Sequence, residues 1–232
     1  WRNDGWYEGK IGYQDSDGDI YSYDLVTHLE QPEGATTSDY GKNTPNDYSP
    51  AITDAGIFWI LSGRSDADTH NRVQGLTLTG DPIPITEVIG DAGNEGIETI
   101  AVDGTRMVYA LYDYSEYRLI LYDIATRHVF TIRQTGEEIR SPAISGETIV
   151  WQQYDGYSWK VYWYRLSEGV VHAMPWSCTN RMSLAVEGTA LVWSDDRNGN
   201  WDLYCYDLSD PYGAEEALIV ARQVRLLGVK AL

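Results

Sequence analysis

The segment SLAVEGTALVWSDDRNGNWDLYCYDL, residues 183–208, contains three short runs that are typical of β-strands. The runs are SLAV, LVWSD and DLYCYDL, and they are rich in β-branched and aromatic residues. The pair Asn198-Gly199 lies between the second run and the third, and such a pair tolerates the positive φ angles of a tight hairpin. The segment therefore predicts antiparallel strands joined by short turns.

The same pattern recurs along the whole chain. Each repeat has a small residue before a β-branched one, and in the first four repeats an aromatic residue follows eight positions later. The small residues are Ala51, Ala101, Ala143, Ala185 and Gly228, and the aromatic residues are Trp59, Tyr109, Trp151 and Trp193. The third run recurs as DIYSYDL (19–25), RVQGLTL (72–78), RLILYDI (118–124), KVYWYRL (160–166) and DLYCYDL (202–208). Units of four short strands and about 46 residues predict the blades of a β-propeller.

We therefore expect residues 1–232 to form a single all-β domain, a five-bladed β-propeller of four-stranded antiparallel blades. The N-terminal repeat supplies a second strand at 10–14 without a first strand, and residues 224–231 supply only a first strand. We expect these two segments to pair and close the ring, because closure removes exposed sheet edges. The alternative is an open, five-repeat fragment of a larger propeller.

Two further expectations concern packing inside the ring. A narrow ring brings the inner strands close together, so the repeated Ala or Gly would avoid a clash across the axis. The strand residues Trp59, Trp151 and Trp193 would form the core between neighbouring blades.

The charge balance excludes some classes of partner. The chain has 17 Lys and Arg against 35 Asp and Glu, a formal net charge of −18. Nucleic acids and anionic membrane surfaces attract basic faces, so neither is an expected partner. No apolar run approaches the roughly 20 residues of a membrane-spanning helix. We expect a monomer without membrane insertion, and the two cysteines, Cys178 and Cys205, allow either a disulfide or two half-buried thiols.

Two segments, SPAISGETIVWQQ (141–153) and DDRNGNWDLYCYDLSD (195–210), resemble the DRNG-x-DIY-x-YDL repeat of TolB-type β-propeller proteins. QDSDGDIYSYDL (14–25) is similar, whereas GRSDADTHNRVQGLTLTG (63–80) lacks the aspartate-tyrosine signature. The resemblance implies a binding scaffold that is extracellular, at the cell surface or periplasmic. It implies no catalytic residue, because the repeat is a motif of the fold.

Alignment of the inner strands brings polar residues together at one mouth of the propeller channel. One ring contains Tyr48, Glu98, Arg140, Met182 and Arg225, with Glu138 and Arg181 in the two rings before it. These residues form either a self-compensating ion cluster or a pocket for an anionic or sugar ligand, since Arg binds carboxylates in a bidentate manner. Aromatic side chains in the connections, such as Trp159, would stack on sugars or pack between blades. The ligand-binding candidates are Tyr48, Glu98, Glu138, Arg140, Arg181, Arg225 and Trp159.

We expect a non-catalytic module that recognises a protein or a glycan at the mouth and needs no cofactor or metal. The alternative is a carbohydrate-active enzyme, a glycoside hydrolase or lyase, in which Glu98 acts with Asp47 or Glu138 as the required carboxyl pair. Ser and Thr at the heads of the inner strands, where such propeller enzymes carry aspartate, favour the binding module. The acidic hairpin Asp15-x-Asp17-x-Asp19 is similar to a calcium loop, but Val26 stands where the final ligand would be, so Asx turns explain it better.

Overall fold

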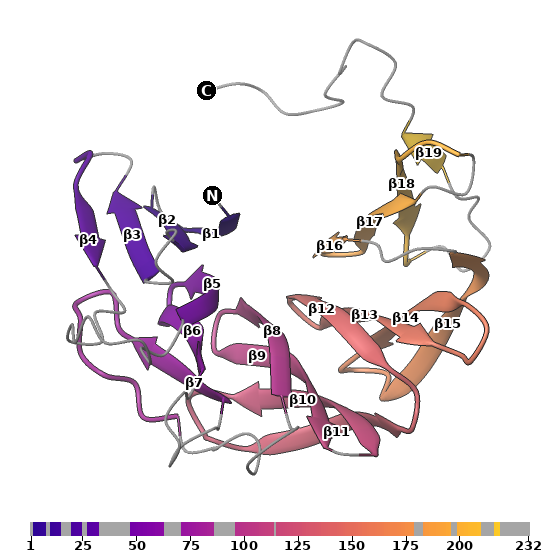
Figure 1. Ribbon diagram of the computed structural model, residues 1–232, viewed down its shortest axis with the longest axis horizontal. Coiled ribbons are helices and arrows are strands. Elements are labelled where there is room, and N and C mark those ends of the chain that lie inside the picture. The colour runs from indigo at the N-terminus through magenta and orange to yellow at the C-terminus, as the bar shows by residue number, and fades with distance from the viewer. Residues whose placement is uncertain are drawn as a thin grey trace.

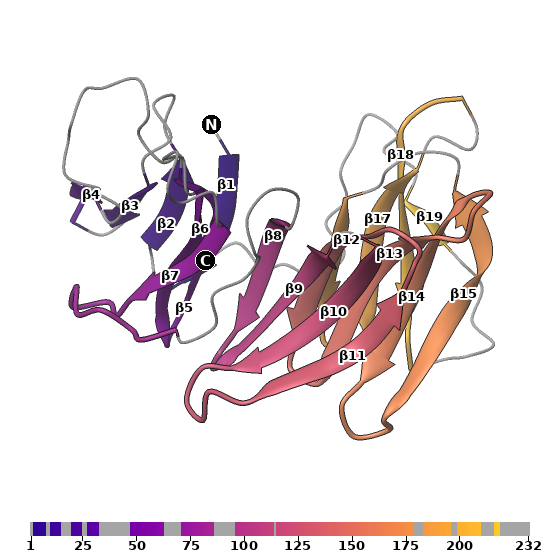
Figure 2. The same cartoon turned by 60° about the horizontal axis from the view of Figure 1, so that its bottom comes forward.

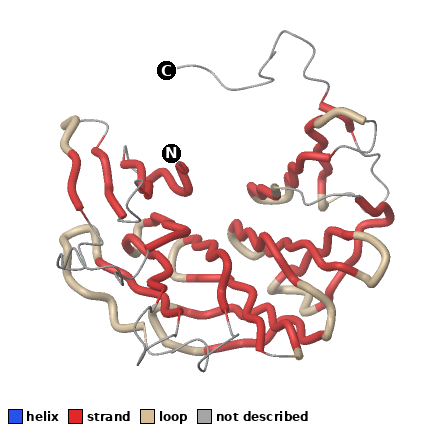
Figure 3. Tube along the Cα trace, in the orientation of Figure 1, coloured by secondary structure: helices blue, strands red, loops and turns tan. Residues whose placement is uncertain are grey.

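The computed structural model describes residues 2–7, 10–14, 20–24, 27–32, 47–62, 71–85, 96–113, 115–178, 183–195, 199–209 and 216–218. Within these residues all helical or extended structure is β-strand, as Figure 3 shows. The same residues contain no helix that is long and apolar enough to cross a membrane.

The strands form five sheets. Sheet 1 contains β1 (Arg2–Tyr7), β2 (Lys10–Gln14), β3 (Ile20–Asp24) and β4 (Glu30–Pro32). Sheet 2 contains β5 (Asp47–Thr53), β6 (Gly56–Ser62) and β7 (Asn71–Leu76). Sheet 3 contains β8 (Gly96–Asp103), β9 (Arg106–Asp113), β10 (Glu116–Asp123) and β11 (Val129–Thr135). Sheet 4 contains β12 (Ile139–Ser145), β13 (Thr148–Tyr154), β14 (Trp159–Arg165) and β15 (Val170–Cys178). Sheet 5 contains β16 (Leu184–Glu187), β17 (Ala190–Asp195), β18 (Asp202–Asp207) and β19 (Glu216–Leu218).

The sheets follow one another around an arc. Within every sheet, consecutive strands pair antiparallel, so each sheet is a meander. The first strands of successive sheets contact one another in the order β1, β5, β8, β12 and β16, and they lie on the inside of the arc (Figure 1). Sheets 3 and 4 stand side by side when the molecule is turned (Figure 2). Figure 1 shows the arc open between sheet 1 and sheet 5.

The inner strands share one irregularity. The register shifts between Tyr48 and Ala51 in β5, and β8 and β12 shift at the equivalent place before Ile100 and Ala143. Ser49 and Ser141 lie in these bulges with φ of 56° and 49°, a conformation that few non-glycine residues adopt. The bulges therefore place Ser49 and Ser141 at the same point of two inner strands.

Hydrogen bonds tie the far end of each inner strand to the next sheet. The Thr53 hydroxyl donates to the Gly104 carbonyl at 3.1 Å, and the Gly188 amide donates to Ser145 Oγ at 3.0 Å. The Gly146 amide donates to the Asp103 carboxylate in the same way. Gly104, Gly146 and Gly188 have φ between 55° and 58°, a conformation that glycine adopts easily. Each glycine lies in the turn after an inner strand, and its amide or carbonyl bonds to the preceding sheet.

The core lies between the sheets and confirms the expected role of Trp151 and Trp193. Trp59, Trp151 and Trp193 are 3%, 0% and 1% exposed, and Trp151 and Trp193 lie in the hydrophobic clusters between sheets 3 and 4 and between sheets 4 and 5. The small inner-strand residues also take part in this packing. Ala51 packs in the cluster between sheets 2 and 3, and Ala143 packs against the cluster between sheets 4 and 5, so the facing sheet limits their size.

The first strand of sheet 1 corrects the expected mode of closure. Residues 2–7 form β1, which pairs with β2 from Arg2 opposite Gln14 to Tyr7 opposite Lys10. β3 pairs with the other edge of β2. Both edges of 10–14 are therefore occupied, and the position predicted for residues 224–231 belongs to β1. Gly5 directly follows the register shift of β1, so β1 also has a small residue at this place. Residues 224–231 lie outside the described part of the chain.

Candidate functional site

Two of the predicted ring residues occupy equivalent backbone positions. Tyr48 pairs with Ile60 in sheet 2, and Arg140 pairs with Gln152 in sheet 4, in both cases directly before the register shift. In β8 the last paired residue before the shift is Ile97, so Glu98 lies inside the shift. The described residues do not include the side chains of Tyr48 and Glu98, and Arg181 and Arg225 lie outside them altogether.

Glu138, Arg140 and Trp159 come together in sheet 4. Arg140 Nε donates to the Glu138 carboxylate, and the Arg140 guanidinium lies 6.0 Å from the centroid of the Trp159 ring. Trp159 is 8% exposed and packs with Val150 and Val161 between sheets 4 and 5. The ring is therefore buried, which agrees with packing between blades and not with an exposed stacking platform, and it supports Arg140 through a cation–π contact.

Arg140 also lines a cavity between sheets 3 and 4. The cavity has a volume of about 190 Å³ and is lined by Gly96, Thr99, Ala110, Tyr112, Tyr117, Ile139 and Arg140. Tyr112 and Tyr117 are opposite each other on β9 and β10, with ring centroids 4.6 Å apart and planes inclined by 39°. This pair was not predicted from the sequence, although the two tyrosines flank the β9–β10 hairpin and so lie opposite each other.

A second cavity of about 220 Å³ lies among the inner strands. Its lining is Ser49, Thr99, Ile100, Ser141, Pro142, Ser183 and Leu184. Four consecutive sheets thus each contribute one hydroxyl residue, and the Ser49 hydroxyl accepts a hydrogen bond from the Ile100 amide at 3.3 Å. Thr99 lines both cavities, so the hydroxyl-lined space adjoins the space beside Arg140.

The opposite ends of the inner strands have a different character. A cavity of about 340 Å³ is lined there by Ile52, Thr53, Asp54, Val102, Asp103, Gly104, Ile144, Ser145 and Glu187. Three of these residues are acidic, whereas the cavities near the heads of the strands contain Arg140 and, among the described side chains, no carboxylate. The described lining near the heads of the inner strands is therefore less acidic than the lining at their other ends.

Metal binding has no support in the part of the chain that the structure describes, where no three His, Cys, Asp or Glu side chains form a group able to hold an ion. The acidic hairpin at residues 15–19 lies outside that part. Asp155 shows what such hairpins do elsewhere. Its carboxylate binds Lys160 Nζ at 2.8 Å and accepts the amides of Ser158 and Tyr157, and these contacts, Lys160 first, hold the pKa of Asp155 well below its usual range.

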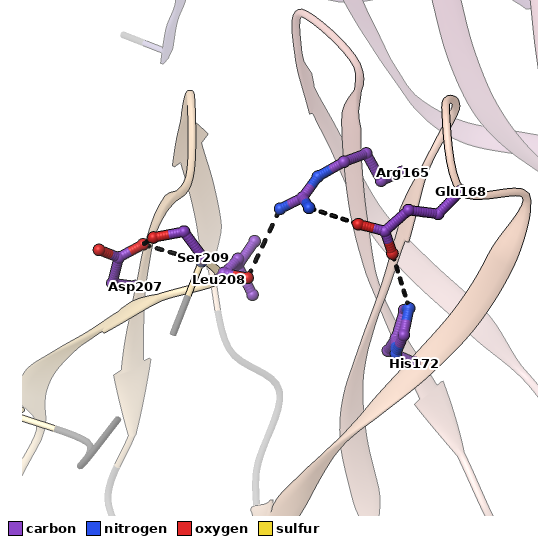
Figure 4. Close-up of polar contacts among 6 residues, drawn as sticks. All are labelled: Arg165, Glu168, His172, Asp207, Leu208 and Ser209. Atoms are coloured by element: carbon purple, nitrogen blue, oxygen red, sulfur yellow. Dashed lines mark hydrogen bonds and ion pairs between the residues drawn. The ribbon is translucent and has the colours of Figure 1, made fainter. Parts of the chain in front are cut away.

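A second arginine, Arg165, has surroundings like those of Arg140, and Figure 4 shows its polar contacts. It is not among the residues that line either cavity near the heads of the inner strands. Arg165 pairs with Glu168, and its guanidinium lies 5.3 Å from the centroid of the Trp163 ring. His172 Nε2 lies 3.1 Å from Glu168, and Arg165 also donates to the Leu208 carbonyl of sheet 5 at 3.5 Å. Arg165 therefore joins two sheets, and it offers a matched comparison for Arg140.

No protein-family model and no curated protein matches the sequence. Solved structures show similar folds, among them oligogalacturonate lyase in complex with manganese, at TM-score 0.60 and 15% identity over 90% of this chain and 62% of that chain. The putative TolB from Agrobacterium tumefaciens matches at TM-score 0.59 and 14% identity, over 90% of this chain and 76% of that one. The β-propeller domain of the Trilobed protease from Pyrococcus furiosus matches at TM-score 0.57 and 12% identity, over 78% and 58%.

These similarities concern the fold. The chain spans less than two thirds of the length of the lyase and of the protease domain, and all three identities are below 25%. The arrangement of antiparallel sheets is therefore that of a TolB-like β-propeller. Function has to be argued from the site.

Proposed function

We propose that this protein is a non-catalytic binding module that recognises a glycan carrying an anionic group. One observation carries the proposal: a tyrosine pair, an arginine and a set of hydroxyl side chains line two adjoining cavities at one end of the inner strands. Each of the three groups matches a different part of such a ligand.

The tyrosine pair supplies the apolar contact. Tyr112 and Tyr117 are half-buried and line the cavity from neighbouring strands, so an aromatic surface is present with little side-chain freedom to lose. The apolar face of a sugar ring packs on such surfaces, and rigid aromatic side chains lose little entropy on binding.

Arg140 supplies the charge. Its guanidinium is held from one side by Glu138 and from another by the Trp159 ring, so its orientation is set before a ligand arrives. A guanidinium fixed in this way suits a carboxylate or sulfate, because its planar N–H groups donate to two oxygens at once. The chain's net charge of −18 disfavours the binding of anions over most of its surface. We therefore expect the anionic group of the ligand to bind beside Arg140.

The hydroxyl residues supply contacts to the sugar hydroxyls. Ser49, Thr99, Ser141 and Ser183 each donate and accept hydrogen bonds, as sugar hydroxyls do. We place Tyr48, Glu98, Arg181 and Arg225 at the rim of the same site, on the strength of the repeat alignment. We further propose that the module forms a five-bladed ring and acts outside the cytoplasm, at the cell surface or in the periplasm; the TolB-like fold and the repeat resemblance support that location.

A carbohydrate-active enzyme remains the second candidate, since a lyase is among the proteins with a similar fold. Ser49, Thr99, Ser141 and Ser183 line the second cavity from the heads of the inner strands, where propeller enzymes of this kind carry aspartate. This observation favours binding over catalysis.

The test is calorimetric titration with a panel of uronate-containing, sulfated and neutral oligosaccharides. We expect an acidic oligosaccharide to bind and Arg140→Gln to weaken its binding by about tenfold or more, because a charge-assisted hydrogen bond is lost. Arg165→Gln, which removes an arginine with the same kinds of neighbours, should bind like the wild type. Equal affinity of Arg140→Gln and wild type, or binding of no panel member, would refute the proposal. Release of new reducing ends would identify an enzyme instead.

A further inference from the structure

The outermost strand of sheet 3 presents an open sheet edge. β11 pairs with β10 along one edge, from Tyr122 opposite Val129 to Tyr117 opposite Thr135, and it stands last in the strand order of its sheet. No described strand pairs with its other edge, which lies on the outside of the arc (Figure 1). The backbone amide and carbonyl groups along that edge are therefore open to pairing with another extended chain.

The first residues of β11 also expose apolar side chains. Residues 125–131 are all exposed, and among them Val129 and Phe130 are 46% and 52% exposed. Neighbouring residues of a strand point to opposite faces, so each face of this edge carries one exposed apolar side chain. The outermost strand of sheet 4 differs, because Val170 is exposed there but the next residue, Val171, is half-buried and packs against the core. Of these two outer strands, only β11 exposes an adjacent apolar pair.

The charge of this edge is opposite to that of the whole chain. Residues 124–136 contain no Asp or Glu, although the chain has 35 of them against 17 Lys and Arg. The same residues include Arg127 and His128, which are both exposed, and Arg133, whose Nε donates to Gln153 Oε1 at 3.3 Å. A basic and apolar edge thus lies on an acidic protein.

The carboxylates beside the two ends of β11 have other partners. Asp123, before the strand, accepts hydrogen bonds from the amide and the hydroxyl of Thr126 at 2.7 Å each. Glu116, beside the other end, accepts a hydrogen bond from Gln134 Nε2 at 2.6 Å. None of the ion pairs between described residues includes Arg127. These two carboxylates therefore leave the charge of Arg127 available to an acidic ligand.

We propose that β11 binds an extended acidic segment of a partner protein, which joins sheet 3 as a further strand. Pairing of backbone groups supplies the affinity in this mode of recognition, and the side chains on the two faces supply the specificity. Apolar side chains of the segment pack on Val129 and Phe130, and its carboxylates face Arg127 and His128. None of these residues lines a cavity at the heads of the inner strands, so this surface is separate from the proposed glycan site.

Charge and backbone chemistry favour this occupant over two others. A second copy of the chain also carries a net charge of −18, and like charges oppose its approach. A nucleic acid lacks the peptide backbone with which an open sheet edge pairs. A short acidic segment carries far less charge than a second copy, and it matches both the edge and the local charge.

Fluorescence anisotropy of short labelled peptides, titrated with the full chain, tests the proposal. We expect a peptide of alternating Glu and Val to bind, and a peptide of alternating Lys and Val to bind about tenfold or more weakly, because the charge of the edge then opposes it. N-methylation of every residue of the Glu-Val peptide should also weaken its binding about tenfold or more, since the peptide then has no amide donor for the edge.

Two aspartate substitutions locate the binding edge, because Phe130 on β11 and Val170 on β15 are both 52% exposed. Phe130→Asp should weaken binding of the Glu-Val peptide about tenfold or more, since an apolar contact is lost and a carboxylate repels the ligand. Val170→Asp should leave the affinity unchanged. Arg127→Gln should weaken binding about threefold, as expected for an exposed charge pair, and this difference should vanish in about 1 M salt.

Each other outcome overturns the proposal. Failure of the Glu-Val peptide to bind, or equal losses in Phe130→Asp and Val170→Asp, excludes β11 as the docking edge. Equal affinity of the methylated and unmethylated peptides means that the ligand does not pair as a strand. Self-association of the chain that Phe130→Asp abolishes and Val170→Asp retains assigns the edge to a second copy. Circular dichroism of every variant establishes that the sheets are still folded.

Discussion

Substitution of Leu119 by alanine tests whether the inter-sheet cores hold the arc together. Leu119 is 0% exposed and lies in the cluster between sheets 3 and 4, together with Ile139, Ile149 and Trp151. Leu119→Ala removes three carbon atoms from this cluster. At about 0.8 kcal/mol for each buried carbon, the transfer contribution is about 2.4 kcal/mol, and the cavity left behind raises the total to about 3 kcal/mol.

Urea unfolding measures this loss. With an m-value of about 3 kcal/mol/M, the upper end for a small protein, the midpoint of Leu119→Ala should fall by about 1 M. Tryptophan fluorescence and circular dichroism should report coincident transitions, which would justify a two-state treatment. Val129→Ala, an exposed aliphatic position on the same sheet, should change the free energy of unfolding by less than about 0.5 kcal/mol.

The reasoning is refuted if Leu119→Ala costs less than about 1 kcal/mol, or no more than Val129→Ala. Either result would mean that sheets 3 and 4 do not depend on the packing between them for stability.

Two further predictions concern a hairpin and two turns. Because the contacts of Lys160, Ser158 and Tyr157 lower the folded-state pKa of Asp155, its stabilising effect is present above the unfolded pKa and is lost as the pH falls through the folded one. The difference in unfolding free energy between wild type and Asp155→Asn should therefore be constant above about pH 5 and shrink below about pH 4, and a difference that grows on acidification would contradict this. A Cβ at Gly56 would lie 2.2 Å from the Leu76 carbonyl oxygen, whereas one at Gly146 would meet nothing within 4 Å. In urea titrations Gly56→Ala should thus cost roughly 3 kcal/mol or more, and Gly146→Ala about 1 kcal/mol from its positive φ alone; similar costs would disprove the steric account.

Several features of the fold could be predicted from the sequence because they depend on local pattern. Trp59, Trp151 and Trp193 recur at one place in an alternating strand, and alternation sends them all to the same face, where the structure buries them. The equivalent places of Tyr48 and Arg140 likewise follow from the repeat, because each lies three residues before the repeated Ala of its strand. The first strand was missed because RNDGWY (residues 2–7) has neither the apolar content nor the Ser-Pro-Ala signature of the other inner strands.

The chemistry of the site required the tertiary structure. Repeat spacing placed Glu138 and Arg140 near each other, but the cavity beside Arg140 also needs Tyr112 and Tyr117 from the neighbouring sheet. Contacts between sheets depend on the angle and separation at which two packed faces settle, and side chains from both sheets determine these together. By itself, then, the sequence determined strand pattern and repeat register, which are properties of a few adjacent residues. Only the packing of one sheet on the next decided that Trp159 is buried and which hydroxyl residues share a cavity.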